Sequence, residues 1–327
     1  MVDIALIEAA ARRLDGHVRE TPLLSSPFLD RIAGRRVLVK AECLQHTGSF
    51  KARGGWAAIS ALDEAARRRG VIAYSSGNHA QGVARAAAAL GAPAVIIMPS
   101  DAPLLKIENT RALGAEVVLY DREGEDRDAI GARIAGDRGL TLVKPYDDPQ
   151  VIAGQGSTGL EIAAQAQARD VMQADVLVCC GGGGLSSGIA LALEARAPGL
   201  RVRTAEPEGF DDMARSLASD RREVNSRRSG SLCDAILTPS PGEITFPILR
   251  RLCGPGLVVT EDEALRAMAL AFLRLKLVLE PGGAVALAAA LFRPEAITGD
   301  AVVAVATGGN VDAAVFAMAL DRHEAAT

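Results

Sequence analysis

The sequence predicts an α/β protein built from two doubly wound parallel sheets. Short apolar runs alternate with helical segments of about a dozen residues, first over residues 53–138 and again over residues 149–306. Continuous apolar runs are typical of strands in parallel sheets, because helices cover both faces of such sheets. The chain of 327 residues is long enough for two units of this kind. We therefore expect two α/β domains with a cleft between them.

The expected elements follow from the spacing of apolar residues along the chain. An amphipathic helix over residues 4–16 and a strand over residues 36–42 come first. The first alternating run comprises helix 53–68, strand 71–74, helix 79–90, strand 94–98, helix 102–113, strand 116–119 and helix 126–138. The second comprises helix 149–168, strand 176–180, helix 185–196, strand 202–205, helices near 244–253, 261–279 and 283–291, strand 301–306 and a last helix from Val311. Residues 218–241, rich in Arg, Ser, Pro and Asp, are expected to form a long surface connection.

Composition argues against several classes of function. The net charge of −4 gives no basic field, so we expect no nucleic-acid partner. The five cysteines are odd in number and form no C-x-x-C pair, which indicates reduced thiols and a cytoplasmic location. The sequence has neither a secretory leader nor an apolar run of roughly 20 residues, so no association with a membrane is expected.

Lys51 is the residue with the most unusual surroundings. It lies in a Gly/Ser turn immediately before a predicted helix, where an amine can point into a cleft and act as a nucleophile. The chain contains only five lysines, which are Lys40, Lys51, Lys106, Lys144 and Lys276. Lys40 ends an apolar run, and Lys106 and Lys144 lie beside turns, where a solvated lysine is the ordinary interpretation. A surface cation near a helix start is the alternative for Lys51.

Three loops that follow predicted strands have unusual composition. They are SSGNH at 75–79, GGGG at 181–184 and TGGN at 307–310. Ligands bind at the carboxyl ends of parallel strands, so these loops are candidate binding segments. Four glycines before a helix allow several backbone N–H groups to converge on an anion, and the helix N-terminus adds partial positive charge. We therefore expect the tetraglycine loop to bind a phosphate group, with a merely tight turn as the alternative.

The glycine spacing distinguishes between two kinds of phosphate-containing cofactor. A dinucleotide-binding loop requires G-x-G-x-x-G followed by an acidic residue, and Glu206 fits the second requirement. The third glycine is missing, because Ser186 or Ser187 stands in its place. Pyridoxal 5′-phosphate (PLP) needs both a phosphate cradle and a reactive lysine, which Lys51 and residues 181–184 supply. A PLP enzyme is therefore the first hypothesis. A nicotinamide-dinucleotide oxidoreductase and a non-catalytic binding protein are the alternatives.

Four motifs occur in an order that resembles one known family. They are TGSFK at 47–51, SSGNH at 75–79, GGGG at 181–184 and TGGNVD at 307–312. From about Thr21 to Asp312 the chain is similar to the threonine/serine dehydratase and serine racemase family of fold-type II PLP enzymes. The resemblance implies a homodimer with a tryptophan synthase β-like fold and the cofactor in the cleft. It also implies a large cofactor-binding domain of residues 1–69 and 148–327, and a small domain of residues 70–147 that closes over the substrate.

The resemblance assigns roles to the residues that match the family motifs. It makes Lys51 the residue that forms the Schiff base with PLP and then removes the Cα proton. Phe50 would lie beside the pyridine ring, Asn78 would contact its 3-hydroxyl, and Thr307 would face the pyridine nitrogen. The phosphate would be held by Gly181, Gly182, Gly183 and Gly184. The substrate carboxylate would be bound by Ser76, Gly77, Asn78 and His79.

The same resemblance implies PLP-dependent β-elimination. Thr307 offers a neutral hydroxyl, which leaves the ring nitrogen largely unprotonated and favours loss of a β-substituent over a long-lived carbanion. The expected substrates are β-hydroxy amino acids such as L-threonine or L-serine, converted to a 2-oxo acid and ammonia. Ser76 leaves racemisation open, because racemases of this family have a serine there as a second acid/base. A hydroxyl that only bonds to the backbone of its turn is the alternative for Ser76.

Two further expectations concern a metal ion and the substrate side chain. The segment at 206–212 resembles the family's cation site, with Glu206, the Phe210 carbonyl and Asp212 as ligands for Mg²⁺, Mn²⁺ or Ca²⁺. A solvated acidic loop is the alternative. Arg127 falls near a position that varies with substrate in the family and could pair with a second carboxylate, as in 3-hydroxyaspartate. A surface ion pair is equally consistent with the sequence. A serine racemase and a 3-hydroxyaspartate dehydratase or racemase are therefore the nearest alternatives in function.

Overall fold

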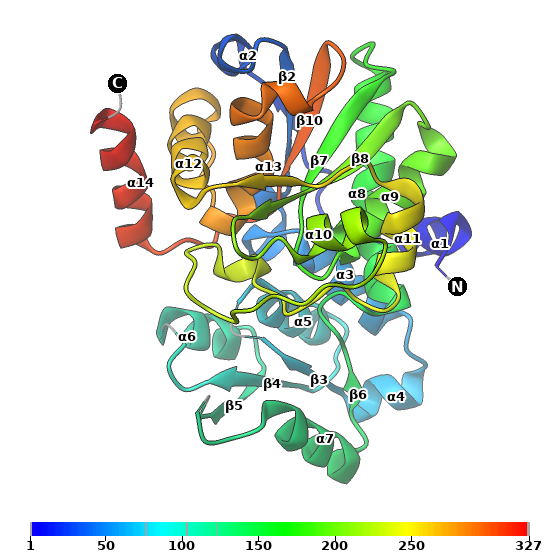
Figure 1. The fold of residues 1–327 in the computed structure, drawn as a ribbon. Helices are drawn as coiled ribbons and strands as arrows, with labels where there is room; N and C mark the ends of the chain where they lie inside the picture. Colours follow the sequence, from blue (N-terminus) through cyan, green and yellow to red (C-terminus); the bar gives the residue numbers. More distant parts are fainter. Residues whose placement is uncertain (1, 76, 103, 122, 326–327) are drawn as a thin grey trace.

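The computed structural model describes residues 2–75, 77–102, 104–121 and 123–325. The chain forms two parallel-stranded sheets, one above the other in Figure 1, with helices on both faces of each sheet. This arrangement confirms the α/β class and the two parallel sheets predicted from the alternating apolar runs.

The larger sheet has six strands in the order β1-β2-β10-β7-β8-β9. Their bounds are β1 (Leu23–Ser25), β2 (Arg36–Ala41), β7 (Ala174–Cys179), β8 (Leu200–Pro207), β9 (Leu257–Val259) and β10 (Ala301–Ala306). All neighbours are parallel except β1, which pairs antiparallel with β2. Strands from opposite ends of the chain lie side by side, since Arg36 of β2 is opposite Ala301 of β10.

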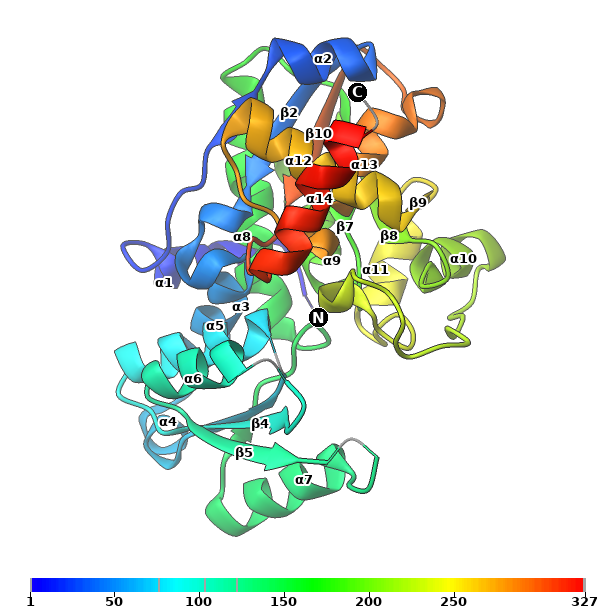
Figure 2. The ribbon, with the colours of Figure 1, turned by 90° about the vertical axis from the view of Figure 1, so that its left-hand side faces the viewer.

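Alternate residues of the central strands face two different layers of helices. Val37 and Val39 belong to one apolar cluster and Leu38 to another. The helices of the two layers are α12 (Glu261–Leu275) and α13 (Pro281–Phe292) on the first face, and α8 (Pro149–Gln167) and α9 (Gly184–Arg196) on the second. Because successive side chains of a strand point to opposite faces, both faces are buried, which explains the continuous apolar runs. The last helix, α14 (Ala313–Ala325), packs on α12 (Figure 2).

The smaller sheet is entirely parallel, in the order β5-β4-β3-β6. Its strands are β3 (Val71–Tyr74), β4 (Ala94–Pro99), β5 (Glu116–Tyr120) and β6 (Thr141–Leu142). Its helices are α5 (Asn78–Ala89), α6 (Leu104–Ala112) and α7 (Arg127–Arg138). α3 (Lys51–Ser60) contacts both α5 and α8. The helix that begins with Lys51 therefore lies between the two sheets (Figures 1 and 2).

Several elements differ from the predicted ones. The predicted helix 53–68 is two helices, because the Asp63 side chain accepts the backbone N–H of Ala66 at 2.7 Å and starts α4 (Glu64–Arg69). The predicted helix 261–279 ends at Leu275, since Lys276 adopts a φ of 61°. The prediction missed α2 (Pro27–Ala33), α10 (Asp212–Ser219), β6 and β9. Helices α1 (Ile4–Leu14) and α11 (Thr245–Leu252) lie where helices were expected.

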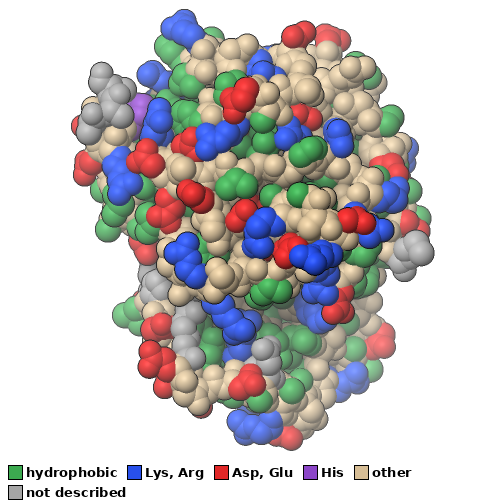
Figure 3. Space-filling view, in the orientation of Figure 1, with side chains coloured by type: hydrophobic (Ala, Val, Ile, Leu, Met, Phe, Trp, Pro, Cys, Tyr) green, Lys and Arg blue, Asp and Glu red, His purple; other side chains and the backbone are tan. Residues whose placement is uncertain are grey.

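The surface connection expected at residues 218–241 is present beyond the end of α10. Residues 220–241, all of which the structure describes, contain only the short 3-10 helix η3 (Asp234–Ile236). Among the described helices, none is long and apolar enough to cross a membrane. On the face shown in Figure 3, basic and acidic side chains are interspersed over the described surface.

Candidate active site

Lys51 is the first residue of α3, and the backbone around it is tightly packed. A Cβ atom added to Gly82 of α5 would lie 2.8 Å from the carbonyl oxygen of Lys51. One added to Gly154 of α8 would lie 2.6 Å from the carbonyl oxygen of Arg53. Both distances are too short for any side chain, so glycine lets three helices meet at backbone contact. The first turn of α3 is thereby fixed between the two sheets.

The Lys51 amine is partly buried and points toward the segment that enters α8. Its Nζ atom donates a hydrogen bond to the carbonyl oxygen of Pro145 at 2.7 Å. The next residue, Tyr146, contacts the tetraglycine loop, since a Cβ atom on Gly182 would lie 2.2 Å from its ring. Lys51 and the tetraglycine loop therefore contact adjacent residues. The structure brings together these two sequence-predicted features, which are separated by more than a hundred residues of chain.

Burial makes the Lys51 amine less basic than an ordinary lysine. It lowers the pKa of Lys51 to about 8, although the nearby carboxylate of Glu280 opposes the shift. The same environment lowers the pKa of His79 to about 3, through burial and then through the charge of Lys51. His79 is thus neutral, with its Nε2 atom 2.9 Å from the Val143 carbonyl oxygen. Because a carbonyl oxygen only accepts, Nε2 carries the proton, and Nδ1 is an acceptor without a hydrogen-bond partner in the described part of the chain.

Asn78 is held by two side chains from the far end of the chain. Its Nδ2 atom donates to Glu280 Oε1 at 2.6 Å, and its Oδ1 atom accepts from Asn310 Nδ2 at 2.7 Å. Asn310 Nδ2 also donates to the Thr47 carbonyl oxygen at 2.7 Å. Three of the predicted motifs are therefore joined through Asn78 and Asn310.

Glu280 is a candidate functional residue that the sequence analysis missed. It is buried, and burial raises the pKa of its carboxyl group to about 7. It lies against Gly308, where a Cβ atom would fall 2.0 Å from Glu280 Oε1. The signal available in the sequence was a single acid between an apolar run and the Pro-Gly-Gly start of a helix. Such an acid rarely belongs in a core without a polar partner.

Phe50 and Thr307 also lie at this site. The Phe50 backbone N–H donates to the Thr307 carbonyl oxygen at 3.2 Å, and Ser49 forms an isolated antiparallel bridge with Gly308. Lys51 Nζ is 5.1 Å from the centre of the Phe50 ring. The loop after β10 and the segment before α3 therefore run side by side, as the shared carboxyl edge of the sheet requires.

The remaining predicted substrate residues are placed less fully. Ser76 lies outside the described residues. Gly77 precedes α5, and its N–H donates to Ser75 Oγ at 3.1 Å. Arg127 begins α7 and is exposed. The pKa of Tyr146 is raised by burial and by two acids, while the positive charges of Arg127 and Arg222 oppose the shift. Both arginines are thus close enough to act on the ring that faces the tetraglycine loop. Tyr146 and Arg222 were not predicted from the sequence.

The proposed metal ligands are buried rather than solvated. Glu206 accepts the backbone N–H groups of Met213 and Ala214 at 2.9 and 2.7 Å. Asp212 Oδ1 accepts from Asn225 Nδ2 at 2.6 Å, whereas Oδ2 has no hydrogen-bond partner in the described part of the chain. The solvated-loop interpretation is therefore wrong for both acids. Among the described residues, no group of three or more His, Cys, Asp or Glu side chains could hold a metal ion.

Lys40 corrects another expectation. It is fully buried rather than solvated, and its Nζ atom contacts Glu161 Oε2 at 2.5 Å and the Thr21 carbonyl oxygen at 2.6 Å. Lys106 is partly buried and lies 3.6 Å from Asp234 Oδ2. Lys144 is exposed, as expected.

Comparison with known proteins identifies the class to which this fold and site belong. The family model described as "Pyridoxal-phosphate dependent enzyme" matches residues 14–308, so the chain belongs to that family. It is 42% identical over 311 residues to an L-threo-3-hydroxyaspartate ammonia-lyase of Pseudomonas sp, covering 95% of this chain and 96% of the relative. The crystal structure of a T.th. threonine deaminase is 43% identical with a TM-score of 0.89, covering 95% of this chain and 99% of the other. Maize serine racemase is 34% identical with a TM-score of 0.90, covering 99% and 98%. Within the family the chain is therefore a PLP-dependent enzyme of the ammonia-lyase and racemase type.

The residues around Lys51 fit PLP. Gly183 has a φ of +90°, and the loop that it shares with Gly182 has no room for side chains. The side chain of Gln155 is completely buried next to this loop, yet neither atom of its amide has a hydrogen-bond partner within the described residues. A buried amide without partners is costly, so it is suited to a bound polar group such as the phosphate.

Proposed function

We propose that the protein catalyses β-elimination from a β-hydroxy amino acid, giving a 2-oxo acid and ammonia, with L-threo-3-hydroxyaspartate as the preferred substrate. The observation that carries this proposal is the Lys51 amine, partly buried near the tetraglycine loop with its pKa lowered to about 8. A buried amine of this kind is the group that PLP chemistry requires.

Lys51 would act in two ways. Its neutral amine would attach the cofactor, and after release by the substrate it would take the proton from Cα. When bound, PLP supplies an electron sink for the pair left at Cα. We assign the phosphate to Gly181, Gly182, Gly183 and Gly184, and the ring contacts to Phe50, Asn78 and Thr307. Residues 76–79 would bind the substrate carboxylate. Ser76 would also be the second acid/base in any racemisation.

The proposed substrate preference rests on the positive charges of Arg127 and Arg222 near Tyr146, although Arg222 also pairs with Glu243 at 3.3 Å. Arg127 and Arg222 act on Tyr146, which covers the tetraglycine loop. A β-hydroxy amino acid with a second carboxylate would be favoured by such a pair of guanidinium groups. The relative that is 42% identical is named for a substrate of this kind. L-Serine and L-threonine lack that group and should bind less well.

We further propose that residues 70–147 form a small domain that closes over the substrate. The contacts that join this region to the rest of the chain at the site include Asn78 with Glu280 and Lys106 with Asp234. We also propose a divalent cation at Glu206, the Phe210 carbonyl and Asp212, because the free Oδ2 atom of Asp212 lacks a partner among the described residues.

The test combines absorbance with product assays. The purified protein reconstituted with PLP should be yellow, and Lys51→Ala should lose that band. Release of 2-oxo acid and ammonia should be fastest with L-threo-3-hydroxyaspartate, and chiral analysis of the remaining amino acid would detect racemisation. Absence of the band in the wild-type protein would refute the role of Lys51.

The substrate preference has its own variant. Arg127→Met should raise KM for L-threo-3-hydroxyaspartate by about tenfold to a hundredfold, the scale of one lost charge-assisted hydrogen bond, and leave KM for L-serine unchanged. Arg133→Met, on the same helix, is the matched control. Equal effects on both substrates would contradict the assignment of Arg127.

A further inference from the structure

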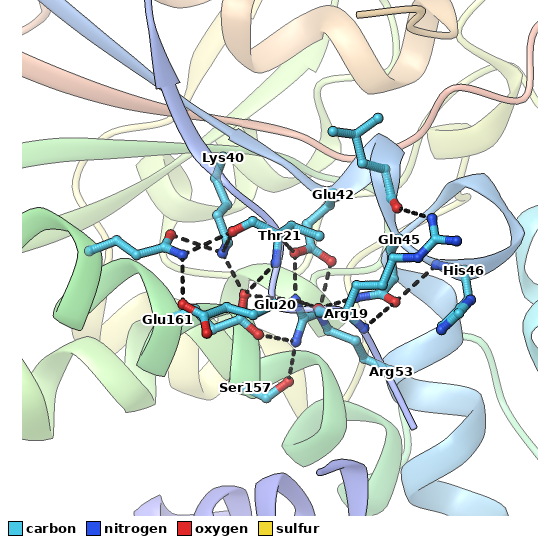
Figure 4. Close-up of polar contacts among 12 residues, drawn as sticks. Arg19, Glu20, Thr21, Lys40, Glu42, Gln45, His46, Arg53, Ser157 and Glu161 are labelled. Atoms are coloured by element: carbon cyan, nitrogen blue, oxygen red, sulfur yellow. Dashed lines mark hydrogen bonds and ion pairs between the residues drawn. The ribbon is translucent and has the colours of Figure 1, made fainter. Parts of the chain in front are cut away.

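We propose that a buried cluster of Lys40, Glu42, Arg53 and Glu161 fixes the position of Lys51 by holding both ends of the segment that carries it. Arg53 would thus be a positioning residue for attachment of the cofactor. The inference rests on the proposed role of Lys51. Figure 4 shows the four side chains pointing toward one another between β2, α3 and α8.

Arg53 is the centre of the cluster and is fully buried. Its guanidinium group contacts Glu42 through two hydrogen bonds of 2.8 Å, from Nε and from one terminal nitrogen. It contacts Glu161 through two more, of 2.6 and 2.9 Å. The Ser157 hydroxyl and the Arg19 carbonyl oxygen accept further hydrogen bonds at 3.1 and 3.2 Å. All three nitrogen atoms of the group are therefore used, and two planar forks fix its orientation.

Lys40 completes the charge balance. Its Nζ atom donates to Glu161 Oε2, to the Thr21 carbonyl oxygen and, at 3.0 Å, to Gln165 Oε1. Glu42 also accepts a hydrogen bond of 2.5 Å from the Thr21 hydroxyl. Two positive and two negative side chains make the cluster neutral, so none of its four charges is left uncompensated.

Three of the four cluster members flank Lys51 in the chain, and the fourth, Glu161, lies in α8. Lys40 and Glu42 come before it, and Arg53 follows in the same turn of α3. Between them, the Gln45 amide exchanges hydrogen bonds of 2.9 and 2.7 Å with the Arg19 backbone. The segment that carries Lys51 is thus held by hydrogen bonds at its start (Lys40 and Glu42), in its middle (Gln45) and just after Lys51 (Arg53). Each tie leads to residues 19–21 or to α8.

Stability alone does not explain such a cluster. Apolar side chains of similar volume often give equal or greater stability than a buried ion pair, because the charges lose their hydration. Directional hydrogen bonds can fix α3 in one orientation about its own axis, which apolar packing does less strictly. That orientation decides whether Lys51 points into the cleft, because each residue of a helix faces a different direction.

The experiment compares two buried arginines. Arg53→Lys keeps the charge but loses the planar fork. Arg203→Lys is the matched control, because Arg203 of β8 is also buried and pairs with Asp175 at 3.2 Å, and its hydrogen bonds among the described residues go to Asp175, Pro255 and Ala296 rather than to the Lys51 segment. Each full-length variant is freed of cofactor and mixed with PLP, and growth of the yellow band is timed. Urea unfolding is measured alongside.

Arg53→Lys should slow incorporation of PLP by about tenfold to a hundredfold, the scale expected for displacement of a reacting group by about 1 Å. Arg203→Lys should lose a similar amount of stability and incorporate PLP at the wild-type rate. Equal incorporation rates in the two variants would overturn the proposal. If Arg53→Lys does not fold, Gln45→Ala decides instead, because it removes one tie without touching a charge. A rate slowed by at least about twofold supports the proposal and an unchanged rate refutes it. Lys51→Ala separates this question from the proposed function, since it alone should abolish the band.

Discussion

Lys40 and Lys51 are both withdrawn from solvent on one short segment, yet their surroundings differ in one decisive respect. The Lys40 amine donates to three acceptors, one of them the Glu161 carboxylate. The single hydrogen bond described for the Lys51 amine goes to the Pro145 carbonyl oxygen. Burial lowers the pKa of both amines; Glu161 and Glu42 oppose the shift at Lys40, and Glu280 opposes it at Lys51. A lysine whose donors are all used stabilises the fold, whereas one with donors to spare can react.

The largest expected effect is the difference in stability between a variant that lacks the Lys40 amine and one that lacks the Lys51 amine. Lys40→Met leaves the Glu161 carboxylate short of a cation, and we expect it to lower the free energy of unfolding by about 3–5 kcal/mol. Lys51→Met in the cofactor-free protein removes one hydrogen bond and should change it by about 1 kcal/mol. Urea unfolding of both variants measures the difference. Similar losses in the two variants would break the comparison.

The same reasoning applies to acids and predicts a cation effect. Both oxygens of Glu161 contact cations, whereas Asp212 Oδ2 has no partner among the described residues. At about a hundred times its dissociation constant, Mg²⁺ or Ca²⁺ should stabilise the protein by about 2.7 kcal/mol. Thermal unfolding with the cation, and again after chelation, measures this. Asp212→Asn should abolish the effect and Asp211→Asn should keep it. A shift that survives Asp212→Asn would place the cation elsewhere.

The pH dependence of PLP incorporation should show whether the Lys51 amine has a lowered pKa. Only a neutral amine forms a Schiff base, and a lysine is neutral above its pKa. Because the pKa of Lys51 is lowered to about 8 from 10.5, the rate should rise about tenfold per pH unit, or 1.4 kcal/mol, up to about pH 8 and then level off. Glu280→Gln removes a charge that raises this pKa, so the plateau should begin at lower pH. A rise that continues to pH 10 would indicate an ordinary lysine.

The smallest effect should come from an outer contact of the cluster. Ser157 Oγ accepts one hydrogen bond from Arg53, which keeps both carboxylate partners when the hydroxyl is removed. Ser157→Ala should therefore cost about 1 kcal/mol of unfolding free energy. Its PLP incorporation should stay close to the wild-type rate. A loss as large as that of Lys40→Met would show that the carboxylates alone do not hold Arg53.

Patterns of neighbouring residues predicted the strands and helices whose formation depends mainly on those residues. The strands at 71–74, 94–98 and 301–306 are apolar runs bounded by turns, and the structure has strands there. β6 has only two residues, too few to show any periodicity. The break in the predicted helix 53–68 depends on one capping side chain, Asp63, within an otherwise helical pattern.

The site was predictable where motifs carry it and hidden where distant residues meet. Lys51 and the tetraglycine loop are unusual in composition, and the family match supports PLP as their ligand. The burial of Lys40 depends on Glu161, 121 residues away, and the contact of Glu280 with Asn78 spans 202 residues. The partners in each pair are too far apart in the chain for a local sequence pattern to include both. The roles assigned to the individual site residues, from Lys51 and the tetraglycine loop to Ser76, Arg127 and the cation ligands, stay predictions.

The pairing of β2 with β10 has a consequence for how the chain is made. The larger sheet cannot close until its last strand, Ala301–Ala306, has left the ribosome and reached Arg36–Ala41. The smaller sheet needs only residues 71–142, which emerge together. During synthesis the smaller sheet should therefore assemble first, while β2 still lacks its partner strand β10. Lys51 is thus synthesised well before β10 and Thr307, which pack against its segment and complete its surroundings.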